Sequence, residues 1–263
     1  MLLNYMSRAP LALAFERYLE CRLLAQFPLR RPILDLGCGD GLFAHILFAE
    51  PIDTGIDPNP REIARARELR AYLELIECTG NAVPKPSGTY QTIFANSVLE
   101  HILLLEPVFR EIHRLLAPGG RFYMTAPAPL FEECTIVNSL LTACGLEGLA
   151  ARYRRFCSDV LWSQQHYHTP EGWQALVERY GFRCIGAIPY DPRGLCLLND
   201  FLYPLAGMSL VTKRLLNRWV LSLRLRRILM RPLSRIMERY LEQGLRTDQG
   251  GLVFLALERG AAA

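Results

Sequence analysis

The sequence predicts an α/β fold in which the strands of an open, mostly parallel sheet alternate with helices. One observation is a short apolar run with a single acid, residues 33–36, which breaks into three glycines and resumes as a helix at Leu42. The other is the repetition of short apolar runs and amphipathic helical segments along the chain. A buried strand, a tight turn and a helix N-terminus are the arrangement with which open α/β sheets bind nucleotide-like ligands.

Size and composition limit the classes of function. A chain of 263 residues accommodates one α/β domain and an additional part. With 51% hydrophobic and 21% charged residues it is expected to be globular rather than disordered. The net charge of +4 is too small to indicate a nucleic-acid partner by itself. The eight cysteines include no C-x-x-C pair, which disfavours a zinc site and favours reduced core cysteines.

Targeting signals are not evident in the sequence. Charges such as Arg8, Glu16 and Arg22 interrupt the first 28 residues, so that no continuous apolar region of a secretory signal forms. The most apolar later stretch, residues 195–211, is interrupted by Asn199-Asp200 and by Pro204, which disfavours a membrane-spanning helix. We therefore expect a cytoplasmic enzyme.

The spacing of the glycine turn narrows the class of ligand. A dinucleotide-binding turn has the pattern G-x-G-x-x-G, with the pyrophosphate at the helix N-terminus. Here Asp35 precedes Gly37, Gly39 and Gly41, so the third glycine comes one residue early and an acid lies at the end of the strand. A carboxylate at this position repels a pyrophosphate but suits an ammonium group.

The stretch from Asp35 to Gly41 closely resembles motif I of the class I S-adenosylmethionine (SAM) methyltransferases. The resemblance extends over about residues 30–190 and 250–258. It implies a class I methyltransferase fold, a Rossmann-like α/β sandwich with a seven-stranded, mostly parallel sheet and an antiparallel last strand. It also implies SAM as the cofactor and S-adenosylhomocysteine as the product.

The resemblance assigns cofactor-binding roles within motif I. Asp35 is expected near the ammonium group of SAM, directly or through a water. The backbone at Gly37, Cys38, Gly39 and Gly41 is expected to approach the methionine part, because a Cβ would intrude there.

The second expected strand, residues 52–57, ends in Asp57, 22 positions after Asp35. Acids at this place accept hydrogen bonds from ribose hydroxyls in nucleotide-binding sheets. Asp57 is therefore expected to hold the ribose, and the adjacent Pro58 is expected to contact the cofactor as well.

The turn after the third expected strand, residues 73–78, contains Asn81 and Ala82. Related methyltransferases usually carry Asp-Ala here, with the acid beside the adenine amino group. The amide oxygen of Asn81 can also accept from an exocyclic amine. An ordinary turn role for Asn81 remains an alternative.

The fourth expected strand, residues 90–95, leads into Asn96 and the segment Leu99-Glu100-His101, which is similar to the same region of the family. Residues at this strand end face the methyl group in such folds, so that Asn96 is expected to contact the cofactor. His101 is a candidate general base because its ordinary pKa near 6.5 suits proton transfer. A structural role for His101 is the alternative.

The chain divides into four expected parts. They are an N-terminal amphipathic helix or cap (1–28), the SAM-binding core (29–190), a basic amphipathic helical insertion (191–249), and the final core strand with the tail (250–263). In similar methyltransferases an N-terminal helix often covers the SAM pocket, but packing on the sheet edge explains residues 8–27 equally well. The remaining elements expected are helices at 61–69, 106–117 and 171–180, strands at 121–127, 182–190 and 251–258, and an irregular connection at 128–165 that shapes the substrate site.

The insertion concentrates positive charge. Residues 201–249 hold ten basic and three acidic residues, a net charge of +7 that leaves −3 for the rest of the chain. On a helical projection the basic residues of segment 213–239 gather on one side, and Pro232 is expected to kink or divide the helix. The opposite side is formed by Leu215, Trp219, Leu223, Leu229, Met230, Leu233, Met237 and Tyr240.

Three interpretations of this insertion remain open. A basic amphipathic helix with a tryptophan is typical of docking on an anionic membrane surface, here through residues 210–243. It could instead be a helical cap over the pocket with solvated basic residues. An RNA-binding face is disfavoured because aromatic residues are not interleaved with the basic ones.

Within the family the chain resembles the small-molecule methyltransferases that include the ubiquinone and menaquinone methyltransferases, and this resemblance implies SAM-dependent methyl transfer to a small acceptor. The apolar and basic insertion favours a hydrophobic or lipid-like acceptor and a peripheral membrane location. The alternatives are a non-catalytic partner subunit with the methyltransferase fold and an RNA methyltransferase. Asn96-Ser97-Val98-Leu99 lacks the N-P-P-Y-type tetrapeptide of nucleobase amino-methylating enzymes, and a nucleic-acid partner is not expected. No metal is expected, because His166 and His168 have no evident third ligand.

Overall fold

The structure, a computed structural model, describes residues 1–216 and 219–260 and divides the chain into two compact units. Unit 1 combines Met1–Leu23, Pro129–Ser163 and Pro189–Leu252, and unit 2 combines Leu24–Ala128, Gln164–Ile188 and the C-terminal segment from Val253. Unit 1 therefore joins the N-terminal helices to segments that are more than one hundred residues away in the sequence.

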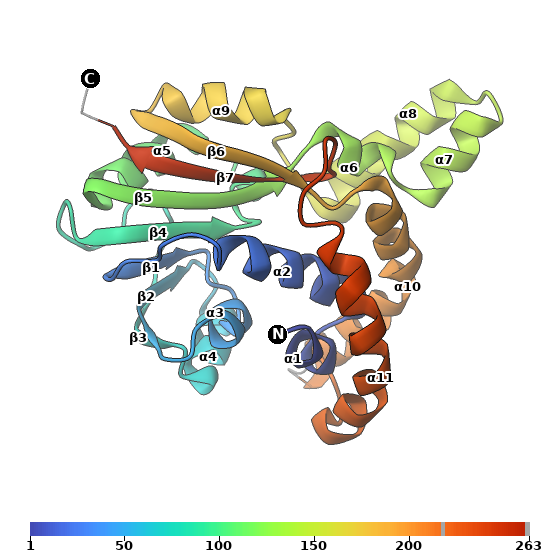
Figure 1. Ribbon diagram of the computed structural model, residues 1–263, viewed down its shortest axis with the longest axis horizontal. Helices are drawn as coiled ribbons and strands as arrows, with labels where there is room; N and C mark the ends of the chain where they lie inside the picture. The colour runs from blue at the N-terminus through green and yellow to red at the C-terminus, as the bar shows by residue number, and fades with distance from the viewer. Residues whose placement is uncertain (217–218, 261–263) are drawn as a thin grey trace. The chain divides into compact units, whose positions relative to one another are not determined.

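A seven-stranded sheet in the order β3-β2-β1-β4-β5-β7-β6 organises the fold (Figure 1). Among β1 to β5, strands that lie next to each other in the sheet pair in parallel. The amide of Gly260 donates to the carbonyl of Gly181, and that of Gly251 donates to Asp191, so β7 runs antiparallel to β6. The predicted sheet, mostly parallel with an antiparallel last strand, is confirmed. Its strands are β1 (Ile33–Leu36), β2 (Ile52–Asp57), β3 (Tyr72–Glu77), β4 (Tyr90–Asn96), β5 (Leu116–Pro127), β6 (Phe182–Tyr190) and β7 (Leu252–Arg259).

The helices of unit 2 are α3 (Leu42–Leu47), α4 (Pro60–Leu69), the 3₁₀ turn η1 (Leu99–His101), α5 (Leu105–Leu115) and α9 (Pro170–Glu178). Two of them, α4 and α9, start at sequence signals for helix N-termini. Asn59 accepts a hydrogen bond from the amide of Arg61 and is followed by a proline at the first helical position, and Thr169 caps α9 in the same way.

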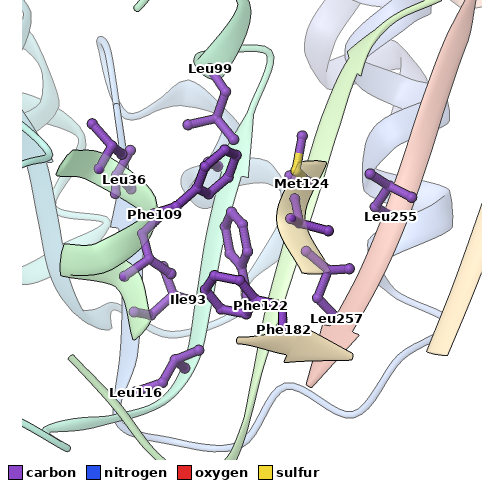
Figure 2. Packing of buried hydrophobic residues seen from close by; sticks show 14 of the residues in the cluster. Leu36, Ile93, Leu99, Phe109, Leu116, Phe122, Met124, Phe182, Leu255 and Leu257 are labelled. Carbon is purple, nitrogen blue, oxygen red and sulfur yellow. The ribbon is translucent and has the colours of Figure 1, made fainter. Parts of the chain in front are cut away.

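The main core of unit 2 lies between the sheet and helices α5 and α9 (Figure 2). Phe109 of α5 packs against Phe182 of β6, and the buried indole of Trp173 in α9 donates to the carbonyl of Pro127. On the opposite face of the sheet Phe43 of α3 contacts Phe94 of β4. Because both faces are covered, β1 is buried along its entire length.

Unit 1 is helical. The chain outside residues 217–218 forms α1 (Leu2–Arg8), most of α2 (Leu11–Leu24), α6 (Pro129–Glu133), α7 (Ile136–Ala143), α8 (Glu147–Phe156), the π-helical turn η2 (Cys157–Trp162), α10 (Arg193–Leu216) and α11 (Leu223–Glu242). The guanidinium of Arg226 in α11 donates to the carbonyls of Met6 and Ala9 at the end of α1. Last-turn carbonyls lack helical partners, so this cation closes the end of α1.

The insertion leaves and re-enters the sheet at adjacent points. The amide of Asp191, just after β6, donates to the carbonyl of Gly244, and the amide of Gly251, just before β7, donates to the carbonyl of Asp191. The Asp191 side chain is fully buried and its Oδ2 lies 3.1 Å from the Cys196 sulfur. Burial is the main cause that raises the pKa of Asp191 from 3.8 to about 7.

The structure corrects several expected element boundaries. The helix expected at 8–27 is α2, which begins only at Leu11, after Pro10, and a separate helix, α1, precedes it over Leu2–Arg8. The segment 128–165 is mostly helical rather than irregular. The helix expected at 106–117 ends at Leu115, and Leu116 already begins β5, whose irregular start is accompanied by a register shift opposite β4.

The insertion is divided at a different place from the one expected. Helix α11 continues through Pro232, and the described residues 219–222, which precede α11, are not helical. Arg218, one of the basic residues of the predicted face, lies outside the described residues, as does the side chain of Leu215. Across the described ranges, the helices fall short of the length or apolar content that crossing a bilayer requires.

Candidate functional site

The predicted motif I forms a tight loop between β1 and α3. The amides of Gly37 and Cys38 both donate to the carbonyl of Ile56 in β2, each at 2.9 Å. Gly37, Gly39 and Gly41 have positive φ angles of 79°, 52° and 76°, which side chains rarely adopt. The three glycines are thus required by the backbone of the loop.

Two of these glycines differ in what surrounds them. A Cβ on Gly37 would lie 2.5 Å from Cγ2 of Val98, so that Gly37 is needed for packing against the segment after β4. A Cβ on Gly39 would meet nothing within 4 Å. The backbone at Gly39 therefore borders open space, where a ligand can approach the main chain.

Asp57 at the end of β2 holds the loop in place. Its Oδ2 accepts from the amide of Gly39 at 3.0 Å, and its Oδ1 accepts from the amide of Asn59 at 2.8 Å. Each carboxylate oxygen has a second lone pair, so these bonds leave acceptor capacity for hydroxyl groups. Pro58 is exposed beside it.

Asp35 is buried at the end of β1, and the Tyr72 hydroxyl donates to its Oδ2 at 2.7 Å. Tyr72 comes from β3 and reaches Asp35 across Gly55 of β2, where a Cβ would lie 2.7 Å from the tyrosine ring. Burial, followed by the Asp35 charge, raises the pKa of Tyr72, so that the phenol remains a proton donor.

The loop is surrounded by carboxylates. Burial raises the pKa of the Cys38 thiol, and the charges of Asp35 and Asp57 raise it further, so that Cys38 stays neutral. Asp40 lies in the loop itself and accepts from the amide of Leu42 at 3.1 Å. Three carboxylates around one turn favour a cationic ligand group over a phosphate.

Asn81 and Ala82 are both exposed in the turn after β3. The Thr79 hydroxyl donates to Oδ1 of Asn81 at 2.6 Å, which is a turn-stabilising contact. A Cβ on the neighbouring Gly80 would lie 3.3 Å from Leu36, so the turn is close to the end of β1. The two alternatives for Asn81 are compatible, because an amide oxygen accepts two hydrogen bonds.

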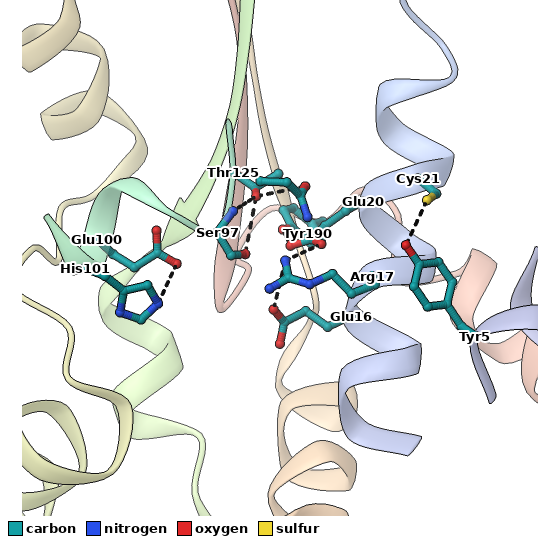
Figure 3. Close-up of polar contacts among 11 residues, drawn as sticks. Tyr5, Glu16, Arg17, Glu20, Cys21, Ser97, Glu100, His101, Thr125 and Tyr190 are labelled. Carbon is teal, nitrogen blue, oxygen red and sulfur yellow. Dashed lines mark hydrogen bonds and ion pairs between the residues drawn. The ribbon is translucent and has the colours of Figure 1, made fainter. Parts of the chain in front are cut away.

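A polar network joins the ends of β4 and β5 (Figure 3). The Thr125 hydroxyl donates to Oδ1 of Asn96 at 3.2 Å and accepts from the amide of Ser97 at 2.8 Å. Ser97 has a positive φ of 51°, an unusual conformation for a residue with a side chain. Such conformations are often found at functional sites, where the surrounding contacts maintain them.

His101 ends the 3₁₀ turn after β4, and 46% of its side chain is exposed. Its Nε2 lies 4.0 Å from Oε1 of the buried Glu100 (Figure 3). The segment before α9 runs alongside, because the amide of Gln165 donates to the carbonyl of Glu100 and Nε2 of His166 lies 2.9 Å from the carbonyl of Ile102. The His101 imidazole is thus held close to the carboxyl edge of the sheet.

The predicted residues accordingly meet at one edge of unit 2, together with residues that the sequence analysis did not select. Of these, Tyr72 could have been suspected from Gly55, since a glycine inside a strand often marks a close approach of another group. Ser97 and Thr125 carried no comparable signal. Among the described residues no group of three or more metal-binding side chains is found.

Comparison with known proteins gives a consistent result. A sequence model described as a methyltransferase domain matches residues 9–186. A 2-phytyl-1,4-naphthoquinone methyltransferase of Thermosynechococcus vestitus is 28% identical over 62% of this chain and 77% of its own. A ubiquinone biosynthesis O-methyltransferase of Methylobacterium nodulans is 28% identical over 70% of this chain and 76% of its own.

Several other curated methyltransferases match over less than half of their own length. Among solved structures, a SAM-dependent methyltransferase of Thermotoga maritima superimposes with a TM-score of 0.58. The alignment covers 95% of this chain and 91% of that one at 13% identity. At this identity the likeness supports the fold alone.

Proposed function

The chain belongs to the methyltransferase domain family and is a SAM-dependent methyltransferase, and we propose that it methylates a small, hydrophobic or lipid-like acceptor at a membrane surface. The observation that carries the proposal is the unequal distribution of exposed apolar side chains between the two units. Of the large apolar side chains exposed in the described part of the chain, only Leu73, Leu103 and Leu104 belong to unit 2, and the other 18 belong to unit 1.

The residues of the motif I edge fit the cofactor. SAM supplies an activated methyl group on a sulfonium, together with an ammonium group. The open space at Gly39 and the surrounding carboxylates suit these cationic groups. We assign Asp35 to the ammonium, Asp57 with Pro58 to the ribose, Asn81 with Ala82 to the adenine, and Asn96 to the reacting end.

His101 is our candidate for the general base if the acceptor is a hydroxyl group. Its imidazole is half-exposed at the carboxyl edge of the sheet, and the buried Glu100 carboxylate lies behind it. An imidazole in that position can accept the hydroxyl proton as the oxygen gains the methyl group. For an acceptor that is already anionic, positioning alone supplies much of the rate and His101 has a structural role.

Helix α11 supports the membrane part of the proposal. With about 3.6 residues per turn, its surface divides into three sides. One side packs into unit 1 and includes the buried Ser234 and Leu241, with Met230, Leu233 and Met237 partly buried. The predicted apolar face is therefore partly an interior surface.

The other two sides of α11 are exposed and differ in chemistry. The basic side consists of Arg224, Arg227, Arg231, Arg235 and Arg239. The apolar side consists of Leu225, Leu229, Ile236 and Tyr240, each more than 40% exposed. An apolar side next to a basic side is the arrangement with which interfacial helices bind anionic membranes. Each basic residue close to such a surface contributes about 1 kcal/mol.

The first experiment identifies the class of acceptor. Purified protein and methyl-labelled SAM are incubated with a total extract of the source cells, which is then separated into organic and aqueous phases. We expect the label in the organic phase. Label found only in the aqueous phase contradicts a lipid-like acceptor. His101→Gln, with unchanged SAM affinity, should lower kcat by about 100-fold or more if the acceptor is a hydroxyl group.

The second experiment tests docking through α11. Charge reversal of Arg224, Arg227, Arg231 and Arg235 to glutamate should abolish flotation with anionic liposomes. The matched control reverses four exposed arginines of unit 2, namely Arg61, Arg67, Arg110 and Arg183. This control should float like the wild type. Persistent flotation of the α11 variant rules out electrostatic docking through this helix, whatever the acceptor.

A further inference from the structure

The segment 135–151 is almost without charge. Glu147 is its one ionisable residue that is charged at neutral pH, and three arginines follow at once, Arg152, Arg154 and Arg155. In a helical pair on a protein surface, charged residues normally cover the side facing water. This segment therefore needs an explanation other than simple solvation.

In the structure the segment forms the α7–α8 hairpin (residues 136–156), a helical hairpin of unit 1 (Figure 1). All eight residues from 142 to 149, which form its tip, are exposed. The exposed fractions of Leu140, Leu146 and Leu149 are 62%, 46% and 51%. The tip thus presents leucines to its surroundings.

Polar contacts anchor the base of the hairpin. The buried residue of α7 is Asn138, whose side chain donates to the carbonyl of Glu133 at 2.8 Å and accepts from Arg154 at 2.8 Å. The amide of Ile136 donates to Asp200 of α10 at 2.8 Å. The buried residue of α8 is the small Ala150, so the large leucines of the tip are left at the surface.

Further apolar side chains are exposed at the end of the hairpin and just after it. Phe156 at the end of α8 and Val160 and Leu161 of η2 are each about half exposed or more. Exposed apolar side chains gathered in one segment in this way point to an interaction site. Its composition, with leucines at the tip and arginines behind them, indicates which kind of partner it fits.

We propose that the α7–α8 hairpin inserts its apolar tip into the interfacial region of a lipid bilayer, with Arg152 and Arg155 at the level of the lipid head groups. Arg155 follows Leu149 by six positions along α8, which corresponds to an axial rise of about 9 Å. Interfacial elements bury their apolar side about 5–10 Å into the boundary between head groups and acyl chains. The distance along α8 therefore matches the depth that the two residue types require.

A lipid surface accounts for the basic residues better than a protein partner does. Arg152 and Arg155 are exposed and follow the tip directly, where they would meet anionic phosphates. The contribution of the leucines differs from that of α11, because the burial of apolar surface is not an electrostatic attraction and requires no anionic lipid. The inference does not depend on which acceptor is methylated.

Cys144 at the tip makes a direct test possible. Among the cysteines of the described residues, Cys144 alone is classed as exposed, and the others are buried or partly buried. The full-length protein with Cys78→Ser and Cys184→Ser is labelled at Cys144 with an environment-sensitive nitrobenzoxadiazole dye. On addition of zwitterionic phosphatidylcholine vesicles we expect a blue shift of the emission, and quenching by nitroxides attached to the acyl chains.

Paired variants separate insertion from other causes. Leu146→Asp with Leu149→Asp should lower partitioning into these vesicles by at least about tenfold. Leu73→Asp, at a leucine of unit 2 that is 70% exposed, should leave it unchanged. A dye that remains in water with neutral and anionic vesicles overturns the inference, even if the protein still floats through α11. A solution dimer that the double variant dissociates, without any response to lipid, assigns the tip to a protein interface and overturns it as well.

Discussion

Replacing Gly37 and Gly39 separately with alanine should separate the fold of motif I from its ligand. At Gly37 the φ of 79° costs about 1–2 kcal/mol for an alanine. The new methyl group, 2.5 Å from Val98, adds an overpacking cost of about 1–3 kcal/mol. Gly37→Ala should therefore destabilise the protein by about 2–5 kcal/mol in urea unfolding.

Gly39→Ala should behave differently. The φ of 52° again costs about 1–2 kcal/mol, but nothing lies within 4 Å of the new methyl group. The methyl group instead occupies the open space where the cofactor would approach the backbone. We expect a folded protein whose SAM affinity, measured by calorimetry, is at least about tenfold weaker.

Two controls make this comparison decisive. Gly119→Ala introduces a methyl group at φ 70°, also with nothing within 4 Å, but outside the candidate site. It should lower stability as Gly39→Ala does and leave SAM affinity unchanged. Val98→Ala should restore part of the stability lost in Gly37→Ala. If Gly39→Ala binds SAM like the wild type, the open space at Gly39 is not the cofactor site.

Three further predictions concern buried or bridging carboxylates. Asp57→Ala should weaken SAM binding by more than about tenfold while the fold persists, as calorimetry and circular dichroism will show. Tyr72→Phe should destabilise the protein by about 1–3 kcal/mol, since the buried Asp35 loses a donor. Folded Asp191 keeps its proton up to about pH 7 and the unfolded chain loses it near pH 3.8, so stability should fall as pH rises between these values. Asp191→Asn should remove up to about 4 kcal/mol of that fall in urea unfolding.

Each of these predictions has a contrary outcome. Unchanged SAM affinity in Asp57→Ala would remove the ribose assignment. A Tyr72→Phe protein as stable as the wild type would mean that Asp35 is satisfied without the phenol. If the stabilities of Asp191→Asn and of the exposed-acid control Asp248→Asn depend on pH in the same way, this would contradict the raised pKa of Asp191.

Local patterns predicted the sheet well. The strand at 182–190 and those at 33–36 and 52–57 have the boundaries that the apolar runs indicated. Their limits are set by glycines, prolines and polar residues within the same stretch, which are visible in sequence. Motif I likewise identified the turn, because the positive φ angles of its glycines are a local backbone requirement.

Contacts between distant residues could not be predicted in the same way. Tyr72 reaches Asp35 from another strand, and Val98 determines why Gly37 lacks a side chain. The two helices of the α7–α8 hairpin span only 8 and 10 residues, and Gly145 and Gly148 interrupt the segment, so the sequence indicated an irregular connection there. Similarly, Met230 lies on the interior side of α11 and Leu229 on its exposed apolar side. A single helical projection of the whole insertion placed both residues on one apolar face.

The position of the insertion also has an evolutionary consequence. Because β6 and β7 are antiparallel neighbours, a hairpin of a few residues could join them, and the hydrogen bond from the Gly251 amide to the Asp191 carbonyl already brings the two ends together. The helical segment could therefore be gained, lost or exchanged without rearranging the sheet. Arg226, however, binds the last carbonyls of α1. A recombination that replaced the insertion alone would leave those carbonyls without their cation, so the N-terminal helices and the insertion are expected to be inherited as a pair.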